Sequence, residues 1–176
     1  MIRRPPRSTL SSSSAASDVY KRQDVSIKTT NGNKVDCGDI LRRMSEKEYE
    51  VIVGQYRQNG GYKVIHTQYT FKIKPEDYNK LWGNMKYELV EEYDTFIKSI
   101  PAGREAQQNT KIKRQVLKNA ISDKKALMVI HPKVDSKKQR RVQCSFKIDE
   151  MIASGVEYAK KDINITIKSS ARKFNK

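Results

Sequence analysis

The sequence has little cysteine and little histidine. Its 176 residues include two of each: Cys37 and Cys144, His66 and His131. The cysteines form no CxxC pair, so they indicate neither a zinc site nor a disulfide framework, and they are typical of a reducing cytosol. Each histidine lies in an apolar alternating run, which indicates a packed or edge histidine and disfavours a histidine-ligated metal centre.

Long apolar runs are also missing. No stretch approaches the roughly 20 apolar residues of a membrane helix. The first 23 residues lack the apolar region that a secretory signal requires. These absences disfavour a membrane-spanning or secreted protein.

Acidic side chains are the third deficit. The chain has 36 Lys and Arg against 20 Asp and Glu, a net charge of +16. The first 23 residues hold five of the basic and one of the acidic side chains, so the remainder still carries +12. Such a surplus favours a polyanionic partner, nucleic acid before an anionic membrane, over a merely soluble basic protein.

Residues 1–23 differ in composition from the rest. They read MIRRPPRSTLSSSSAASDVYKRQ, which is rich in Ser, Arg and Pro and has no apolar periodicity. An organellar transit peptide is one interpretation. The string more closely resembles a translated sequencing-adapter sequence. We therefore expect 1–23 to be a non-native or disordered leader, and 24–176 to be a single domain, the C-terminal part of a longer protein.

Apolar periodicity and turn residues divide residues 24–176 into strands and helices. Strands are expected at 24–30, 50–58, 62–73, 126–132, 141–148 and 163–169, with NGG at 59–61 as a hairpin turn. Helices are expected at 39–44, 75–82, 87–99, 105–121 and 149–154, and 31–39 is expected to be a turn. Strands that flank a central helical block predict one α/β or α+β domain.

The segment DVSIKTT at 24–30 is the first candidate site. Alternation places Asp24, Ser26 and Lys28 on one face of a strand. In metal-assisted phosphodiester cleavage, an acid holds a cation such as Mg²⁺, and a lysine stabilises the developing negative charge or orients water. The alternative is the exposed face of an edge strand that carries ordinary charges.

The order of motifs favours the cleavage interpretation. IKTT, the dipeptide GD, VIVGQYRQ and PKVDSKKQRRVQCS follow one another along the chain. This succession resembles that of a group of bacterial type II restriction endonucleases, over most of residues 24–148. The resemblance implies the PD-(D/E)XK nuclease fold, a restriction-endonuclease-like mixed β-sheet flanked by helices, here incomplete at the N-terminus.

The resemblance also implies an activity and its partners. It implies Mg²⁺-dependent, sequence-specific cleavage of double-stranded DNA in the bacterial cytoplasm by a homodimer, with a cognate DNA methyltransferase as genetic partner. The lack of a nucleotide-binding loop disfavours an ATP-driven restriction system. A different class of function is the alternative: a basic nucleic-acid-binding protein without catalytic activity. A third and weaker hypothesis is a structural domain that binds no nucleic acid.

The resemblance assigns roles to the residues near the first strand. The (D/E)XK element fits best on the tripeptide SIK, with Lys28 as the catalytic lysine. Ser26 stands where these enzymes carry an acid, so Asp24 is expected to supply the metal-binding carboxylate, with Asp36 as a further candidate ligand. Asp39 is expected to cap a helix. The motif's first acid would fall within the adapter-like leader, so the chain is expected to be a fragment with an incomplete active site.

A second candidate site is the basic segment between Lys133 and Arg141. Arginine can read guanine and glutamine can read adenine in the major groove, whereas lysine contacts to phosphates set affinity. We expect Gln139 and Arg140 to contact bases and Lys137 and Lys138 to contact phosphates; the alternative is a solvated charged loop. The expected DNA-binding residues are Lys133, Lys137, Lys138, Gln139, Arg140, Arg141 and Gln143, with Arg57 and Arg104 as weaker candidates.

Overall fold

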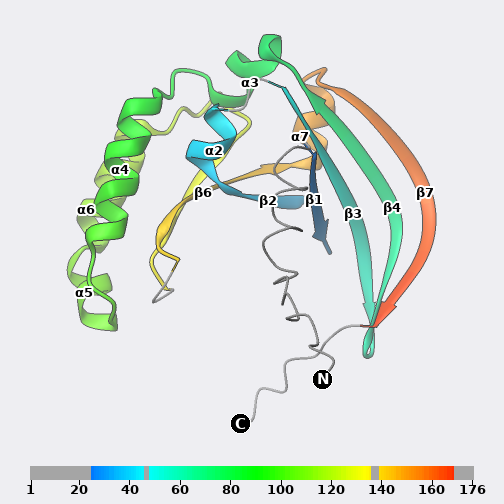
Figure 1. Ribbon diagram of the computed structural model, residues 1–176, viewed down its shortest axis with the longest axis horizontal. Coiled ribbons are helices and arrows are strands. Elements are labelled where there is room, and N and C mark those ends of the chain that lie inside the picture. The colour runs from blue at the N-terminus through cyan, green and yellow to red at the C-terminus, as the bar shows by residue number, and fades with distance from the viewer. Residues whose placement is uncertain (1–24, 46–47, 136–138, 169–176) are drawn as a thin grey trace, which may run out of the picture.

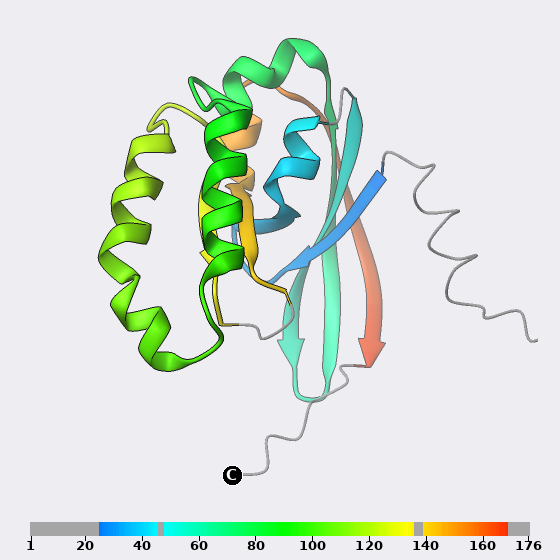
Figure 2. The ribbon, with the colours of Figure 1, turned by 60° about the vertical axis from the view of Figure 1, so that its left-hand side comes forward.

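The computed structural model of the protein describes residues 25–45, 48–135 and 139–168. They form a mixed α+β fold with a four-stranded sheet, a three-stranded sheet and a layer of helices (Figure 1). The three-stranded sheet lies between the four-stranded sheet and the helix layer, as Figure 2 shows from a second direction. The predicted α+β class is therefore confirmed.

The four-stranded sheet has the order β1-β3-β4-β7. β1 (Val25–Thr30) pairs in parallel with β3 (Tyr49–Asn59), whereas β4 (Tyr62–Ile73) pairs antiparallel with β3 and with β7 (Glu157–Lys168). The predicted hairpin turn joins β3 to β4, and Gly60 has a φ of 54° there, a conformation that glycine adopts at little cost. The sheet is therefore mixed, with β1 at one edge.

The three-stranded sheet has the order β2-β6-β5 and is antiparallel. Its strands are β2 (Lys34–Asp39), β5 (Val129–Lys133) and β6 (Arg141–Lys147). The prediction of a turn throughout 31–39 is wrong for Lys34–Asp39, which form β2. The side chains of Val35 and Cys37 alternate into the core there. The backbone of the segment pairs with β6, so the segment is a strand.

The helices fall close to the predicted ranges, with one exception. The predicted helix at 105–121 is divided at Thr110, whose φ of −93° and ψ of 0° depart from regular helix geometry. The Thr110 hydroxyl donates to the Ala106 carbonyl at 2.7 Å, which closes the last turn of the first part. The helical elements are α2 (Ile40–Ser45), the 3₁₀ turn η1 (Pro75–Asp77), α3 (Tyr78–Trp82), α4 (Tyr87–Ser99), α5 (Arg104–Asn109), α6 (Lys111–Ile121) and α7 (Ile148–Ala153). In the part of the chain that the structure describes, no helix combines the length and the apolar character needed to cross a membrane.

The hydrophobic core joins the two sheets and the helix layer. Phe71 of β4 meets Phe146 of β6 edge to face, with 5.4 Å between ring centroids, and both side chains are buried. Burial of one such side chain contributes about 1.5–3 kcal/mol. On the other side of the three-stranded sheet, Val90 and Ile97 of α4 belong to the same core, and α4 packs against β6. β6 therefore lies at the centre of the molecule.

Asp94 of α4 adds a polar link to this packing. Its carboxylate is buried and accepts a hydrogen bond from the Val142 amide of β6 at 2.6 Å. Lys98, one helical turn further along α4, reaches the other carboxylate oxygen at 2.6 Å. The carboxylate therefore fixes α4 against the start of β6, beside Arg141.

Tyr93 of α4 makes a contact that depends on pH. Its hydroxyl donates to the Arg114 carbonyl of α6 at 3.0 Å, and burial raises the pKa of Tyr93 to about 12. Since the folded-state pKa lies above the ordinary value of 10.0, the associated stability is complete below pH 10 and is lost as the pH rises through 12. We expect the urea midpoint of the wild type to fall more steeply between pH 10 and 12 than that of Tyr93→Phe, measured by circular dichroism. Parallel pH profiles for the two proteins would contradict this assignment.

Candidate functional site

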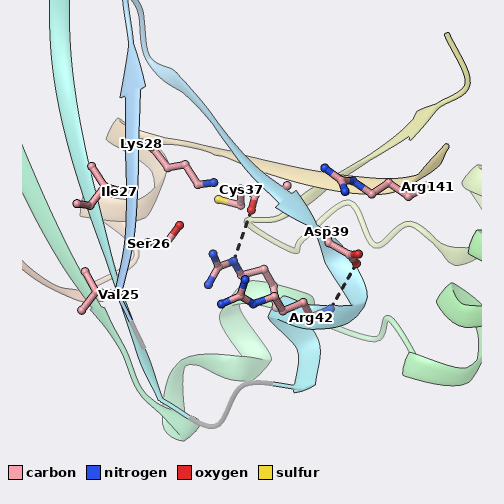
Figure 3. Close-up of a pocket in the computed structure, with 10 residues that line it drawn as sticks. Val25, Ser26, Ile27, Lys28, Cys37, Asp39, Arg42 and Arg141 are labelled. Carbon is pink, nitrogen blue, oxygen red and sulfur yellow. Dashed lines mark hydrogen bonds between the residues drawn. The ribbon is translucent and has the colours of Figure 1, made fainter. Parts of the chain in front are cut away.

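A basic pocket of about 520 Å³ lies where β1, β2 and α2 come together (Figure 3). We call it the Lys28 pocket. Nine of its ten lining residues come from one continuous stretch, residues 25–43, and the tenth comes from the start of β6. The lining residues are Val25, Ser26, Ile27, Lys28, Cys37, Gly38, Asp39, Arg42, Arg43 and Arg141.

β1 presents its polar face to the interior. Ser26 is buried and Lys28 is half-buried, and both point into the pocket, whereas Ile27 on the opposite face is 66% exposed. The predicted alternation of this strand is confirmed. The polar side chains of Ser26 and Lys28 lie on the inner face of β1. In an ordinary edge strand, polar side chains point toward solvent instead. The inward position of a lysine on a strand favours a functional role for it.

α2 holds two arginines at the floor of the pocket. Asp39 caps this helix, as predicted, because its Oδ1 accepts hydrogen bonds from the amides of Leu41 at 3.1 Å and Arg42 at 3.4 Å. The first turn of the helix then directs Arg42 toward β1 (Figure 3), and Arg43 lines the same pocket. Neither arginine was predicted as a site residue. The sequence signal that could indicate them is a pair of arginines in the first turn of a helix, shortly after its capping residue.

Arg43 is almost fully buried, with 5% of its surface exposed. Its Nε donates to the Cys37 carbonyl at 3.5 Å, and its guanidinium lies 5.0 Å from the ring centroid of Tyr49. Those contacts hold the charge in one place, since a guanidinium over an aromatic face is attracted by the ring. The pocket therefore has a fixed positive charge at its floor.

Arg141 closes the pocket from the start of β6. Its side chain points toward β2 in Figure 3. The Arg141 Nε is buried and meets no hydrogen-bond acceptor among residues 25–45, 48–135 and 139–168. A buried donor without an acceptor costs about 1–3 kcal/mol, so this end of the pocket carries an unsatisfied polar group.

The electrostatics of the Lys28 pocket favour an anion. Burial lowers the pKa of Lys28, and the nearby charges of Arg43 and Arg42 lower it further, against the opposing effect of the Cys37 and Cys144 thiols. A hydrogen bond from the Cys144 thiol lowers the pKa of Cys37, and Arg43 and Lys28 add to this effect, while burial opposes it. Among the described residues that line the pocket, four cationic side chains thus face one carboxylate, Asp39, which already caps a helix.

The described part of the structure does not bring the expected metal ligands together. Asp24 lies outside them. Asp36 is exposed and lines a separate hollow of about 350 Å³ with Asn33 and Tyr56, away from Lys28. Within the described parts of the chain, no group of three His, Cys, Asp or Glu side chains could hold a metal ion. These residues alone do not fit a magnesium site.

The predicted basic segment is spread over several places. Lys137 and Lys138 lie outside the described residues. Lys133 and Gln143 line a hollow of about 380 Å³ with Pro132 and Asp135 among others. Gln139 is exposed.

Arg140 and the two weaker candidates lie apart from this hollow. The Arg140 Nη1 donates to the Ile100 carbonyl, directly after α4, so part of this guanidinium is committed to holding the fold. Arg57 is exposed near the tip of the β3–β4 hairpin, and Arg104 is exposed at the start of α5. Neither Arg57 nor Arg104 lines the Lys28 pocket.

Comparison with known proteins adds no relative: no protein-family model, no curated protein and no solved structure matches this chain.

Proposed function

We propose that this chain binds double-stranded DNA through the Lys28 pocket and acts as a type II restriction endonuclease. The observation that carries the proposal is the convergence of Lys28, Arg42, Arg43 and Arg141 on one pocket of a strongly basic chain. A backbone phosphate of DNA is the polyanionic group that such a cluster fits, through charge-assisted hydrogen bonds from guanidinium groups. The order of sequence motifs supplies the link to restriction endonucleases.

In this proposal each pocket residue has a role. The guanidinium groups of Arg42, Arg43 and Arg141 orient the phosphate, and the Lys28 amine stabilises the negative charge that develops on it during hydrolysis. Mg²⁺ would supply an activated water and neutralise charge. Asp39 is occupied as a cap, so the described lining of the pocket leaves no carboxylate to hold Mg²⁺, and Asp24 is the carboxylate that would hold it in this proposal.

The second candidate is a DNA-binding protein without cleavage. It is favoured because the described residues of the pocket supply one carboxylate, and a phosphate-binding site needs cations alone, whereas metal-dependent hydrolysis also needs acids. Both candidates share the phosphate contact at Lys28. They differ in whether the phosphodiester bond is broken.

One experiment separates the two candidates. The full chain is incubated with supercoiled plasmid DNA, with Mg²⁺ or with a chelator, alongside the Lys28→Ala variant. Discrete fragments that depend on Mg²⁺ and disappear in Lys28→Ala support the endonuclease. Intact plasmid with salt-dependent binding that Lys28→Ala weakens shows that the chain as given binds DNA without cleaving it, which is the second candidate for this chain, and no binding at low salt contradicts both.

A further inference from the structure

The two cysteines of the chain, 107 positions apart in sequence, lie side by side in the fold. Asp36 pairs with Ser145 and Gly38 pairs with Cys144, so the strand register shifts at Cys37, which is the extra residue of a β-bulge. A bulge sets two residues of one strand opposite one residue of its partner. Cys37 and Cys144 therefore face each other across the β2–β6 pair, and each thiol shifts the pKa of the other, downward at Cys37 and upward at Cys144.

Only one of these thiols borders a cavity. Cys37 lines the Lys28 pocket, although 3% of its surface is exposed, whereas Cys144 is fully buried. A Cβ placed on Gly38 would meet no atom within 4 Å, so the backbone next to Cys37 adjoins open space. A small molecule that enters the pocket thus reaches Cys37 before Cys144. The positive charges of Lys28 and Arg43 beside Cys37 favour the reactive thiolate.

We propose that Cys37 and Cys144 are a modification site, at which hydrogen peroxide that enters the Lys28 pocket produces an intramolecular disulfide. The Cys37 thiolate attacks one peroxide oxygen, breaks the O–O bond and becomes a sulfenic acid, and the leaving oxygen takes a proton to form water. The Cys144 sulfur then attacks the Cys37 sulfur and expels the sulfenic oxygen as a second water. Two thiols are oxidised by two electrons, and one hydrogen peroxide is reduced to two waters.

The site is connected to the function through its location, and this step rests on the proposed function. DNA whose phosphate occupies the Lys28 pocket covers the route to Cys37. Bound DNA should therefore slow the oxidation. The disulfide can form without DNA. Disulfide formation and its slowing by DNA can therefore be tested separately.

The first test uses the reduced full chain and stoichiometric hydrogen peroxide. Free thiols are alkylated afterwards, and intact mass and a non-reduced peptide map are measured. We expect each monomer to lose two hydrogen atoms and to yield one linked peptide pair containing Cys37 and Cys144, which dithiothreitol reverses. Since the chain has only two cysteines, any internal disulfide must join them. Two unreacted thiols, or oxidation of Cys37 beyond the sulfenic acid with no disulfide, would overturn the proposal.

Two variants identify the order of attack. In Cys144→Ser, the sulfenic acid on Cys37 should accumulate and be trapped by dimedone, whereas in Cys37→Ser the buried Cys144 should stay reduced. Equal reactivity of the two single variants would contradict entry through the pocket. Circular dichroism of each variant checks that it is folded. The test of disulfide formation in the wild-type chain does not depend on either variant.

A final measurement tests the link to DNA. The rate of disulfide formation is compared with and without a saturating mixed-sequence duplex at low salt. We expect about a tenfold slower reaction with DNA. Equal rates would contradict the assignment of DNA to the Lys28 pocket while leaving the disulfide in place, so the two failures can be distinguished.

Discussion

Charge reversal at Lys28 is expected to weaken the binding of duplex DNA about 100-fold, which corresponds to about 2.7 kcal/mol. Lys28→Glu removes one cation from the pocket and places a carboxylate where the phosphate is proposed to bind. Repulsion then adds to the lost attraction, within a half-buried site where water screens charges poorly. The measurement is fluorescence anisotropy with a mixed-sequence duplex, repeated at several salt concentrations.

Lys161→Glu is the matched control for this prediction. Lys161 lies on β7, is exposed and makes no contribution to the Lys28 pocket. The two variants have the same net charge, so a general loss of attraction affects both equally. If Lys161→Glu weakens binding as much as Lys28→Glu does, the pocket is not the DNA site. The neutral variant Lys28→Ala should also reduce the salt dependence by about one phosphate contact.

The second large effect is expected for stability, at Asp94. Asp94→Ala should lower the free energy of unfolding by about 3 kcal/mol, because it leaves the buried Val142 amide without its acceptor and removes the partner of Lys98. Urea unfolding followed by circular dichroism measures this change. The affinity for DNA should also fall, because Val142 directly follows Arg141.

Asp94→Asn distinguishes the two contacts of this carboxylate. The amide oxygen can still accept the hydrogen bond from Val142, whereas the ion pair with Lys98 is lost. That lysine is 59% exposed, so we expect the ion pair to contribute less than about 1 kcal/mol. Glu91→Ala, on an exposed position of the same helix, should change stability by less than about 0.5 kcal/mol. A loss in Asp94→Asn equal to that in Asp94→Ala would contradict the role given to the Val142 hydrogen bond.

Much of the fold could be predicted from local patterns. The β3–β4 hairpin and α4 follow from alternation, the NGG turn and helical spacing, and these signals are local in sequence. β2 was missed because its polar and glycine-containing sequence is typical of a turn, and only its pairing with β6 makes it a strand. β7 begins six residues before the predicted strand, because its charged first half pairs with β4. Glu157 also forms ion pairs with Lys72 of β4 and with Lys74, which directly follows β4.

The candidate site could be predicted only in part. The inward face of β1 follows from alternation, so Ser26 and Lys28 were identified together. Arg42, Arg43 and Arg141 were not grouped with them, because their approach depends on how α2 and β6 pack against β1. The contact between Cys37 and Cys144 depends on a bulge, and no spacing rule indicates it.

The continuity of residues 25–43 has a consequence for how such a site can change over time. This stretch is one crossover, which leaves the four-stranded sheet at β1, passes through β2 and α2, and returns at β3. Nearly the whole lining of the Lys28 pocket belongs to it, and Arg141 alone is contributed from elsewhere. Insertion, recombination or exchange of a single short segment could therefore transfer or redesign the site. An exchanged segment would need to keep the pairing of β2 with β6 and the buried Val35 and Ile40, while the chemistry of the pocket diverged.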